Sequence, residues 1–149
     1  DFILHTDGSG KEHFTIPGGG SEKPSSKDSF DKGEHFFQMN GKEVFKTAIN
    51  VVPKCISEIL KKNHRTIDEI KFLLPHQPSI KILQEVAKQV NLPFEKVKTN
   101  MDRYANTSGA TIPLILDETL KNNTLKSGDL LLFAAVGAGW TWGTALYKW

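Results

Sequence analysis

Apolar residues recur with helical spacing in three stretches of the chain. The first runs from Val44 to Leu60 and keeps its apolar side chains on one face, with Pro53 inside it as an expected interruption and kink. A second helix is expected to begin near Pro78, since proline is tolerated in a first turn. A third is expected after Thr107 or Ser108, either of which can cap it. The pattern therefore predicts three amphipathic helices.

Short apolar runs bounded by turn residues predict the strands. Phe72–Leu74 is one such run and is interpreted as a central strand. Leu130–Val136 is a longer run, as expected for a strand buried on both faces. Thr141–Tyr147 follows a glycine turn and predicts the returning strand. Near the start of the chain, Phe2–His5 and His13–Ile16 predict two strands around a turn.

Two stretches lack a clear period. Gly18–Lys32 is rich in Gly, Ser, Pro, Asp and Lys and is expected to form a long surface loop. Val97–Met101 is expected to be a short strand or an extended segment. Strands that alternate with helices predict one α/β domain over residues 1–149, with helices packed on a mixed β-sheet.

Composition narrows the class of protein without assigning a function. The 149 residues are 38% hydrophobic and 24% charged, which is typical of a folded globular domain. A formal net charge of +2, with no basic run interleaved with aromatics, argues against nucleic acid as a partner. The longest apolar stretch is too short for a bilayer, so we expect no membrane. A single cysteine excludes an internal disulfide and fits a cytoplasmic location.

Several familiar motifs are incomplete. Gly8–Lys11 resembles part of a phosphate loop but is followed by Glu12, and the glycines at 137–139 join two strands instead of a strand and a helix. The histidines are scattered, with no cysteine or carboxylate set around His5 and His13 that completes a metal site. Cys55 lies on the apolar face of a predicted helix and is expected to be a buried, inert thiol. We therefore expect no metal ion.

Two polar segments remain as candidates for chemistry. Residues 75–82 contain His76, and residues 102–110 contain Asn106; each lies between an extended segment and a following helix. Loops of this kind build the sites of open α/β sheets. On spacing and chemistry alone, a structural histidine at His76 and a turn residue at Asn106 are the favoured interpretations.

The motifs taken together resemble one family. The matching stretches are Met39–Phe45, His76-Gln77 with the following Ile80–Ile82, Asn106-Thr107-Ser108 at 30 residues after His76, Lys126–Asp129, and Gly137–Gly143. In this order, over residues 35–149, they resemble the C-terminal half of a β-ketoacyl-acyl carrier protein synthase III, a condensing enzyme of the thiolase fold. Residues 1–34 match only loosely.

This resemblance implies an acyltransferase of fatty acid biosynthesis. Such enzymes move an acyl group from acyl-CoA onto a cysteine and condense it with malonyl-acyl carrier protein, releasing carbon dioxide; CoA thioesters are substrates and no cofactor is implied. His76 and Asn106 match the family's catalytic donors, which stabilise the enolate of the malonyl group. The backbone of Gly137 and Ala138 matches the oxyanion hole.

Three further positions match the mouth of the family's pantetheine tunnel. These are Lys42, Ser79 and Lys81, expected to contact CoA or the carrier protein, although for Lys81 a solvated helix face is an equal alternative. Ser79 and Lys42 stand where the family usually has Asn, which puts the details of CoA contact in doubt. Ala138 also departs from the usual Gly.

The family's nucleophilic cysteine is expected to lie in an N-terminal half that precedes these residues. Cys55 has neither its position nor its setting at a strand-to-helix elbow. The chain alone is therefore expected to be inactive and to need the missing half or a partner chain, with a homodimer as the complete form. Two alternatives stay open: a non-catalytic partner subunit that binds carrier protein or shapes an acyl tunnel, and another thiolase-fold synthase.

Overall fold

The structure is a computed structural model that describes residues 1–122 and 124–149. Its helices and strands, in chain order, are β1 (Phe2–Thr6), β2 (Phe14–Thr15), α1 (Lys27–Asp31), β3 (Gln38–Met39), α2 (Gly41–Lys62), β4 (Ile70–Pro75), α3 (Ile80–Gln89), α4 (Met101–Tyr104), α5 (Thr111–Lys121), β5 (Leu130–Gly137) and β6 (Thr141–Lys148). Short 3-10 helices lie between them at η1 (Gly8–His13), η2 (Ile67–Glu69), η3 (Phe94–Lys96) and η4 (Ser108–Ala110).

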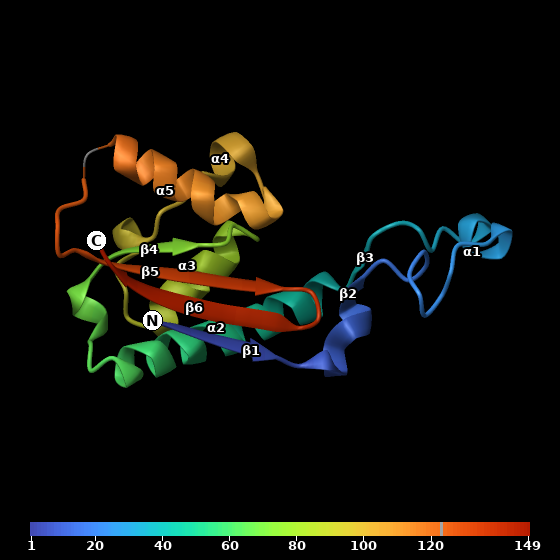
Figure 1. Cartoon of the computed structure of the whole chain (residues 1–149), viewed down its shortest axis with the longest axis horizontal. Coiled ribbons are helices and arrows are strands. Elements are labelled where there is room, and N and C mark those ends of the chain that lie inside the picture. The colour runs from blue at the N-terminus through green and yellow to red at the C-terminus, as the bar shows by residue number, and fades with distance from the viewer. Residues whose placement is uncertain (123) are drawn as a thin grey trace.

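A four-stranded sheet in the order β1-β6-β5-β4 forms the centre of the molecule (Figure 1). β4 and β5 are parallel, whereas β6 runs antiparallel to both β5 and β1, so the sheet is mixed as predicted. The strand predicted at Phe72–Leu74 is present as β4, but it lies at an edge of this sheet. An isolated parallel bridge from Leu73 to Val97 extends that edge, and the rest of Val97–Met101 does not form a strand.

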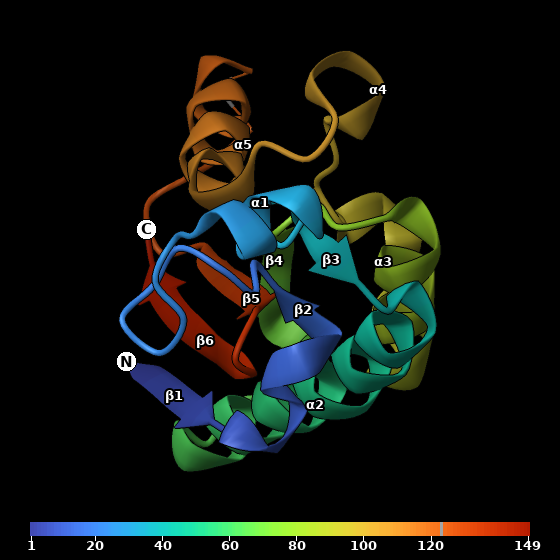
Figure 2. The same cartoon turned by 90° about the vertical axis from the view of Figure 1, so that its right-hand side faces the viewer.

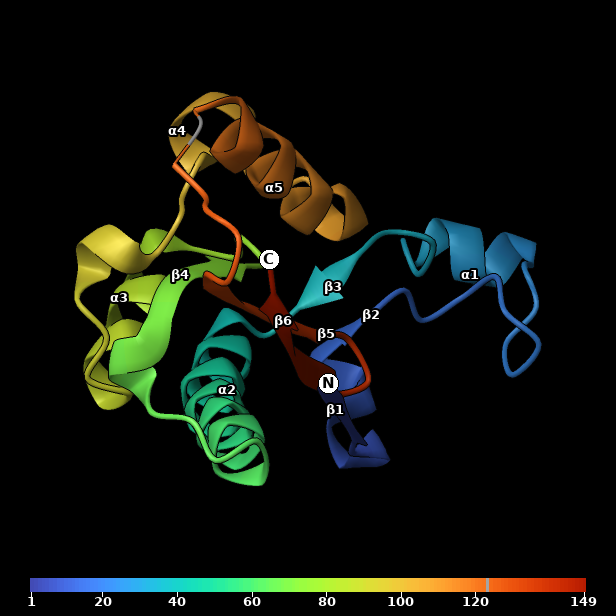
Figure 3. The same ribbon diagram turned by 60° about the vertical axis from the view of Figure 1, so that its left-hand side comes forward.

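Helices cover both faces of the sheet. α2 and α3 pack on one face and α5 on the other (Figure 3). Neighbouring residues of one strand point to opposite faces: Leu73 belongs to the large core beneath α2 and α3, whereas Leu74 packs with Ile115 of α5. Burial on both faces explains why β4 and β5 are apolar runs without alternation.

The N-terminal ends of the helices are set by capping contacts that the sequence pattern predicted only in part. Asn40 caps α2 by accepting a hydrogen bond from the Glu43 N–H, and α2 then continues through Pro53, so the predicted interruption is wrong. Ser79 caps α3, which begins at Ile80, two residues after the expected start at Pro78, so Pro78 lies ahead of the cap. The predicted capping of α5 by Thr107 or Ser108 is also wrong, because η4 precedes it and no side chain caps it.

The first 40 residues differ most from expectation. β1 is present, but it pairs with β6, and the short β2 pairs with β3 instead of with β1. The expected turn after β1 is the 3-10 helix η1, and the expected loop at Gly18–Lys32 contains α1. The segment from β2 to β3 forms an arm that projects beyond the carboxyl ends of β4 and β5 (Figure 1) and lies in front of the sheet in the view along the arm (Figure 2). None of the described helices combines the length and apolar character needed to span a membrane.

Candidate active site at the carboxyl ends of the parallel strands

The carboxyl ends of β4 and β5 meet at one end of the sheet because the two strands are parallel and adjacent. The first turns of α2, α3 and α5 lie at that same end (Figure 1). Open α/β sheets build their sites in this position, where loops leave the strands and helix N-termini converge. The segments around His76, Asn106 and Gly137 all belong to this end.

His76 follows directly on β4 and is held by the sheet. Its backbone N–H donates to the carbonyl oxygen of Ala134 on β5 at 2.8 Å, which continues the parallel ladder one residue beyond the strand. The side chain is half-buried. Burial lowers the pKa of His76 from its usual value, and a hydrogen bond with the Ser108 main chain acts in the opposite direction. The net effect favours a neutral imidazole at neutral pH.

Asn106 lies in the turn between α4 and η4, and its side chain is exposed. The Oδ1 atom accepts a hydrogen bond from the Ser108 N–H at 2.9 Å. This contact fixes the orientation of the amide, because only the oxygen can accept. The Nδ2 group has no hydrogen-bond partner within residues 1–122 and 124–149 and remains available as a donor.

Ser108 connects the two candidates, since its main chain contacts both the His76 ring and the Asn106 side chain. The turn that achieves this has an unusual backbone. Ala105 and Ser108 adopt φ values of 55° and 52°, in a backbone region that residues other than glycine rarely occupy. Strain of this kind persists where surrounding contacts enforce it, and it is concentrated at functional sites.

Gln77 is a buried residue of this site to which the sequence pattern gave no role. Its side chain is 0% exposed, and its Nε2 donates to the carbonyl oxygens of Pro75 and Lys98, both at 3.1 Å. Its Oε1 accepts from the Asn100 N–H at 3.4 Å. Gln77 thereby ties the strand end that carries His76 to the segment that leads to Asn106. The only sequence signal was a polar residue directly after His76.

A second polar cluster, formed by Asn100, Arg103 and Glu118, also supports the turn that carries Asn106. Asn100 is 1% exposed and donates from Nδ2 to Glu118 of α5 at 3.3 Å. Arg103 of α4 binds the same carboxylate with two guanidinium nitrogens, at 2.7 and 2.9 Å. The bidentate pair fixes α4, which precedes Asn106, against α5, which follows it. No sequence pattern links Arg103 with Glu118, which are 15 positions apart.

The other candidate residues occupy the same end of the sheet. Gly137 ends β5, and a Cβ there would meet no described atom within 4 Å, so the space it faces is open. Ala138 is exposed in the turn after it. Lys42 and Lys81 are exposed in the first turns of α2 and α3. Ser79 accepts from the Ile82 N–H at 3.2 Å, so its hydroxyl already has a local role as a helix cap.

Cys55 lies in the middle of α2 and is 2% exposed. Burial raises the pKa of its thiol, and the Thr144 hydroxyl lies 3.4 Å from the sulfur. The expectation of a buried thiol is confirmed. Its position is unlike that of an activated nucleophile, which needs a lowered pKa and an accessible sulfur.

Comparison with known proteins places these features in one family. The family model described as "3-Oxoacyl-[acyl-carrier-protein (ACP)] synthase III C terminal" matches residues 60–149. The chain is 40% identical over 148 residues, 99% of its length, to a beta-ketoacyl-[acyl-carrier-protein] synthase III of Rhodopirellula baltica. It is 39% identical over 149 residues to the protein of the same name from Porphyromonas gingivalis. Residues 1–34, expected to match only loosely, fall within these alignments.

Solved structures agree with this relationship. A 3-oxoacyl-(acyl carrier protein) synthase III from Pseudomonas aeruginosa matches 99% of the chain with a TM-score of 0.86 at 30% identity. The enzyme from Thermus thermophilus matches 99% of the chain with a TM-score of 0.85 at 34% identity. The α/β fold is therefore that of the C-terminal half of a thiolase-fold condensing enzyme, as the sequence motifs predicted.

The chain spans less than half of these proteins: 43% and 44% of the two relatives, and 43% and 45% of the two solved chains. The family model covers more than half of the chain itself. The chain belongs to the C-terminal family of the 3-oxoacyl-[acyl-carrier-protein] synthases III.

Proposed function

We propose that this chain is the C-terminal half of a 3-oxoacyl-acyl carrier protein synthase III and supplies its decarboxylation donors. In the complete protein, an N-terminal half would carry the cysteine that accepts an acyl group from acyl-CoA. Malonyl-acyl carrier protein would then lose carbon dioxide and attack that thioester. The names of the relatives support this activity for the complete protein, and the chain alone is expected to be inactive.

The observation that carries the proposal is the pairing of His76 with the Asn106 turn at the ends of the parallel strands. Ser108 occupies the Asn106 oxygen, so the amide presents its N–H2 group as a donor. Burial lowers the pKa of His76, so the ring is neutral at neutral pH and offers no extra mobile proton. A preorganised pair of neutral donors suits the enolate that forms when malonyl loses carbon dioxide.

The remaining residues are assigned roles in the same reaction. The main-chain N–H groups of Gly137 and Ala138 would hold the thioester oxygen of the acyl-cysteine, in the open space that Gly137 faces. Lys42 and Lys81 would contact the phosphates of CoA or the carrier protein, with Ser79 at the same entrance. No cofactor is needed, since both thioesters are substrates. A homodimer and a cytoplasmic location stay predictions.

The test separates the two half-reactions in the complete protein. We expect His76→Ala and Asn106→Ala each to slow release of carbon dioxide from malonyl-acyl carrier protein by roughly 100–1000-fold, the cost of losing one such donor. Covalent acylation by acyl-CoA, read by intact mass, should persist. Asn50→Ala, an exposed position on α2, serves as the matched control.

Two outcomes would count against this assignment. Loss of acylation with decarboxylation intact would show that the two residues serve the other half-reaction. Unchanged condensation in both variants would favour the second candidate, a non-catalytic partner subunit that binds carrier protein or shapes an acyl tunnel. That candidate is consistent with the local hydrogen bonds of Ser79 and Asn106, which stabilise turns whether or not a substrate binds.

A further inference from the structure

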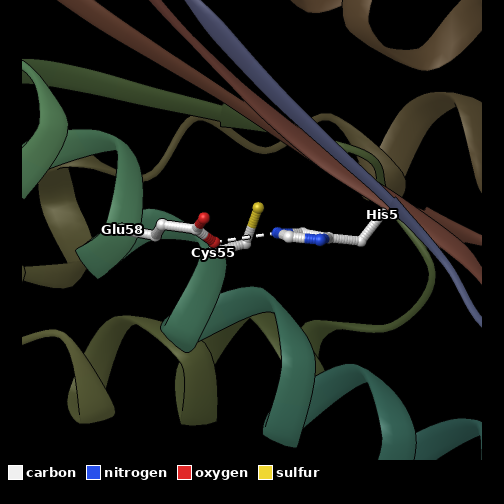
Figure 4. A group of neighbouring side chains, drawn as sticks. All are labelled: His5, Cys55 and Glu58. Carbon is white, nitrogen blue, oxygen red and sulfur yellow. Dashed lines mark hydrogen bonds and ion pairs between the residues drawn. The ribbon is translucent and has the colours of Figure 1, made fainter.

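Three side chains with metal-binding atoms meet between β1 and α2, on the face of the sheet that α2 covers (Figure 4). His5 extends from β1, and Cys55 and Glu58 extend from neighbouring turns of α2. Their ligand atoms all lie within 4.8 Å of one another. His5 Nε2 and Glu58 Oε2 are 2.8 Å apart. This group is the one set of three such residues found in the described part of the chain.

We propose that His5, Cys55 and Glu58 form a binding site for Zn²⁺ or a chemically similar transition-metal ion. The ligands would be His5 Nε2, Cys55 Sγ and one carboxylate oxygen of Glu58. Imidazole and thiolate together select borderline or soft ions such as Zn²⁺ and Co²⁺, whereas Mg²⁺ and Ca²⁺ prefer oxygen alone. The site is independent of the proposed condensing activity.

The distances are close to those that a tetrahedral ion needs. Bonds of about 2.0–2.1 Å to nitrogen or oxygen and about 2.3 Å to sulfur place the ligand atoms of a tetrahedron roughly 3.3–3.8 Å apart. The His5–Glu58 contact of 2.8 Å must open slightly, and the more distant atoms must approach. The His5 and Glu58 side chains are 37% and 51% exposed, so both can make this adjustment without moving the core.

The surroundings hold two of the ligands in place. The His5 ring stacks on Trp142 with its centroid 5.5 Å away, and the two residues are paired across β1 and β6. The Cys55 sulfur is fixed by the buried helix, with the Thr144 hydroxyl 3.4 Å away as a partner for a thiolate. Solvent reaches the site from the side of Glu58, which leaves the fourth position of the ion to water.

Binding would exchange one proton for the ion. The thiol must lose its proton to become a ligand, and the proton passes to solvent as the Zn²⁺–sulfur bond forms. The His5–Glu58 hydrogen bond is replaced by two bonds to the ion, and the neutral His5 ring carries its proton on Nδ1 instead of Nε2, so that the Nε2 lone pair is free to bind. Because His5 is on the edge strand and the other ligands are on α2, the ion would join β1 to α2, and the stability of the folded state would rise with the logarithm of the ion concentration above its Kd.

Cobalt titration of the complete protein, kept reduced with a phosphine, tests the site. Co²⁺ bound to a thiolate gives an intense near-ultraviolet absorption that nitrogen and oxygen ligands do not give. We expect this absorption in the parent protein, its displacement by Zn²⁺, and its loss in Cys55→Ser. Since other cysteines can be present in the complete protein, the difference between parent and Cys55→Ser is the measured quantity.

Two ligand variants at partly exposed positions keep the test independent of core packing. His5→Gln and Glu58→Gln should retain the fold and weaken Co²⁺ binding by more than the roughly 10–100-fold that loss of an outer partner costs. His13→Gln removes a histidine that contacts Glu12 and should leave binding unchanged. An absorption that is absent in the parent, equal in Cys55→Ser, or unaffected by both ligand variants would overturn the proposal.

Discussion

Gln77 is a single side chain that joins the two loops carrying the proposed donors His76 and Asn106. It has no exposed surface, yet three main-chain groups from three different positions use its amide. A buried amide with all partners satisfied favours a single arrangement, because any other arrangement leaves polar groups without partners. We regard Gln77 as a positioning residue for the proposed donors.

Replacing Gln77 should therefore cost both stability and alignment. Gln77→Ala leaves the Lys98 carbonyl and the Asn100 N–H without their partner, at about 1–3 kcal/mol for each group left unsatisfied in the interior. Urea unfolding measures this loss. Gln89→Ala is the control, because Gln89 is exposed and its side chain donates to Glu85 on the helix surface, and its change should stay within about 0.5 kcal/mol. Equal stability of the two variants would contradict the role of Gln77.

At the scale of elements, the turn that carries Asn106 depends on its flanking helices. α4 is too short to be stable by itself, and the Arg103–Glu118 pair fastens it to α5. The hydrogen bonds from Arg103 hold the pKa of Glu118 below its usual value, despite the opposing effect of burial. The carboxylate therefore favours the folded state only while it is ionised.

The lowered pKa of Glu118 predicts that the folded state loses stability in acid. A carboxyl with a lowered folded pKa contributes fully above its unfolded value of about 4.3, and the contribution disappears as the pH falls through the folded value. Unfolding free energies measured between about pH 6 and pH 3 should fall less steeply in Glu118→Gln than in the parent. Glu95→Gln, exposed in η3, should follow the parent. Parallel curves for parent and Glu118→Gln would exclude this linkage.

At the scale of the whole molecule, α2 packs its apolar face within this chain. Its buried residues from Ala48 to Leu60 belong to the core of this chain. Large exposed apolar side chains are instead concentrated in the arm, namely Ile16, Phe30, Phe36, Phe37 and Met39. Large exposed apolar side chains gathered on one segment are typical of a contact with another chain or segment.

The 149-residue chain alone should therefore bind an apolar fluorescent dye through its arm. Phe36 is 65% exposed, and Phe36→Ser should reduce dye fluorescence while changing the unfolding free energy by less than about 0.5 kcal/mol. Phe2→Ser is the control, since Phe2 is 64% exposed but lies on β1, outside the arm. Dye binding that falls equally in both variants would show that the arm is not the site.

The main helices and strands and the family relationship could be predicted from the sequence pattern. Amphipathic spacing predicted α2 and α3, because burial on one face repeats apolar residues with the helical period, and uninterrupted apolar runs predicted β4 and β5, because these strands are buried on both faces. The order of short motifs around His76, Asn106 and Gly137 identified the condensing-enzyme relationship. Their catalytic roles are still predictions.

Which distant residues meet could be learned from the folded arrangement alone. The pairing of β1 with β6, the Arg103–Glu118 pair and the group of His5 with Cys55 and Glu58 all join positions far apart in the sequence. Such contacts leave no local period, since they depend on how the sheet and helices pack. The scattered histidines led us to expect no metal site. The packing of β1 against α2 nevertheless places His5 beside Cys55 and Glu58.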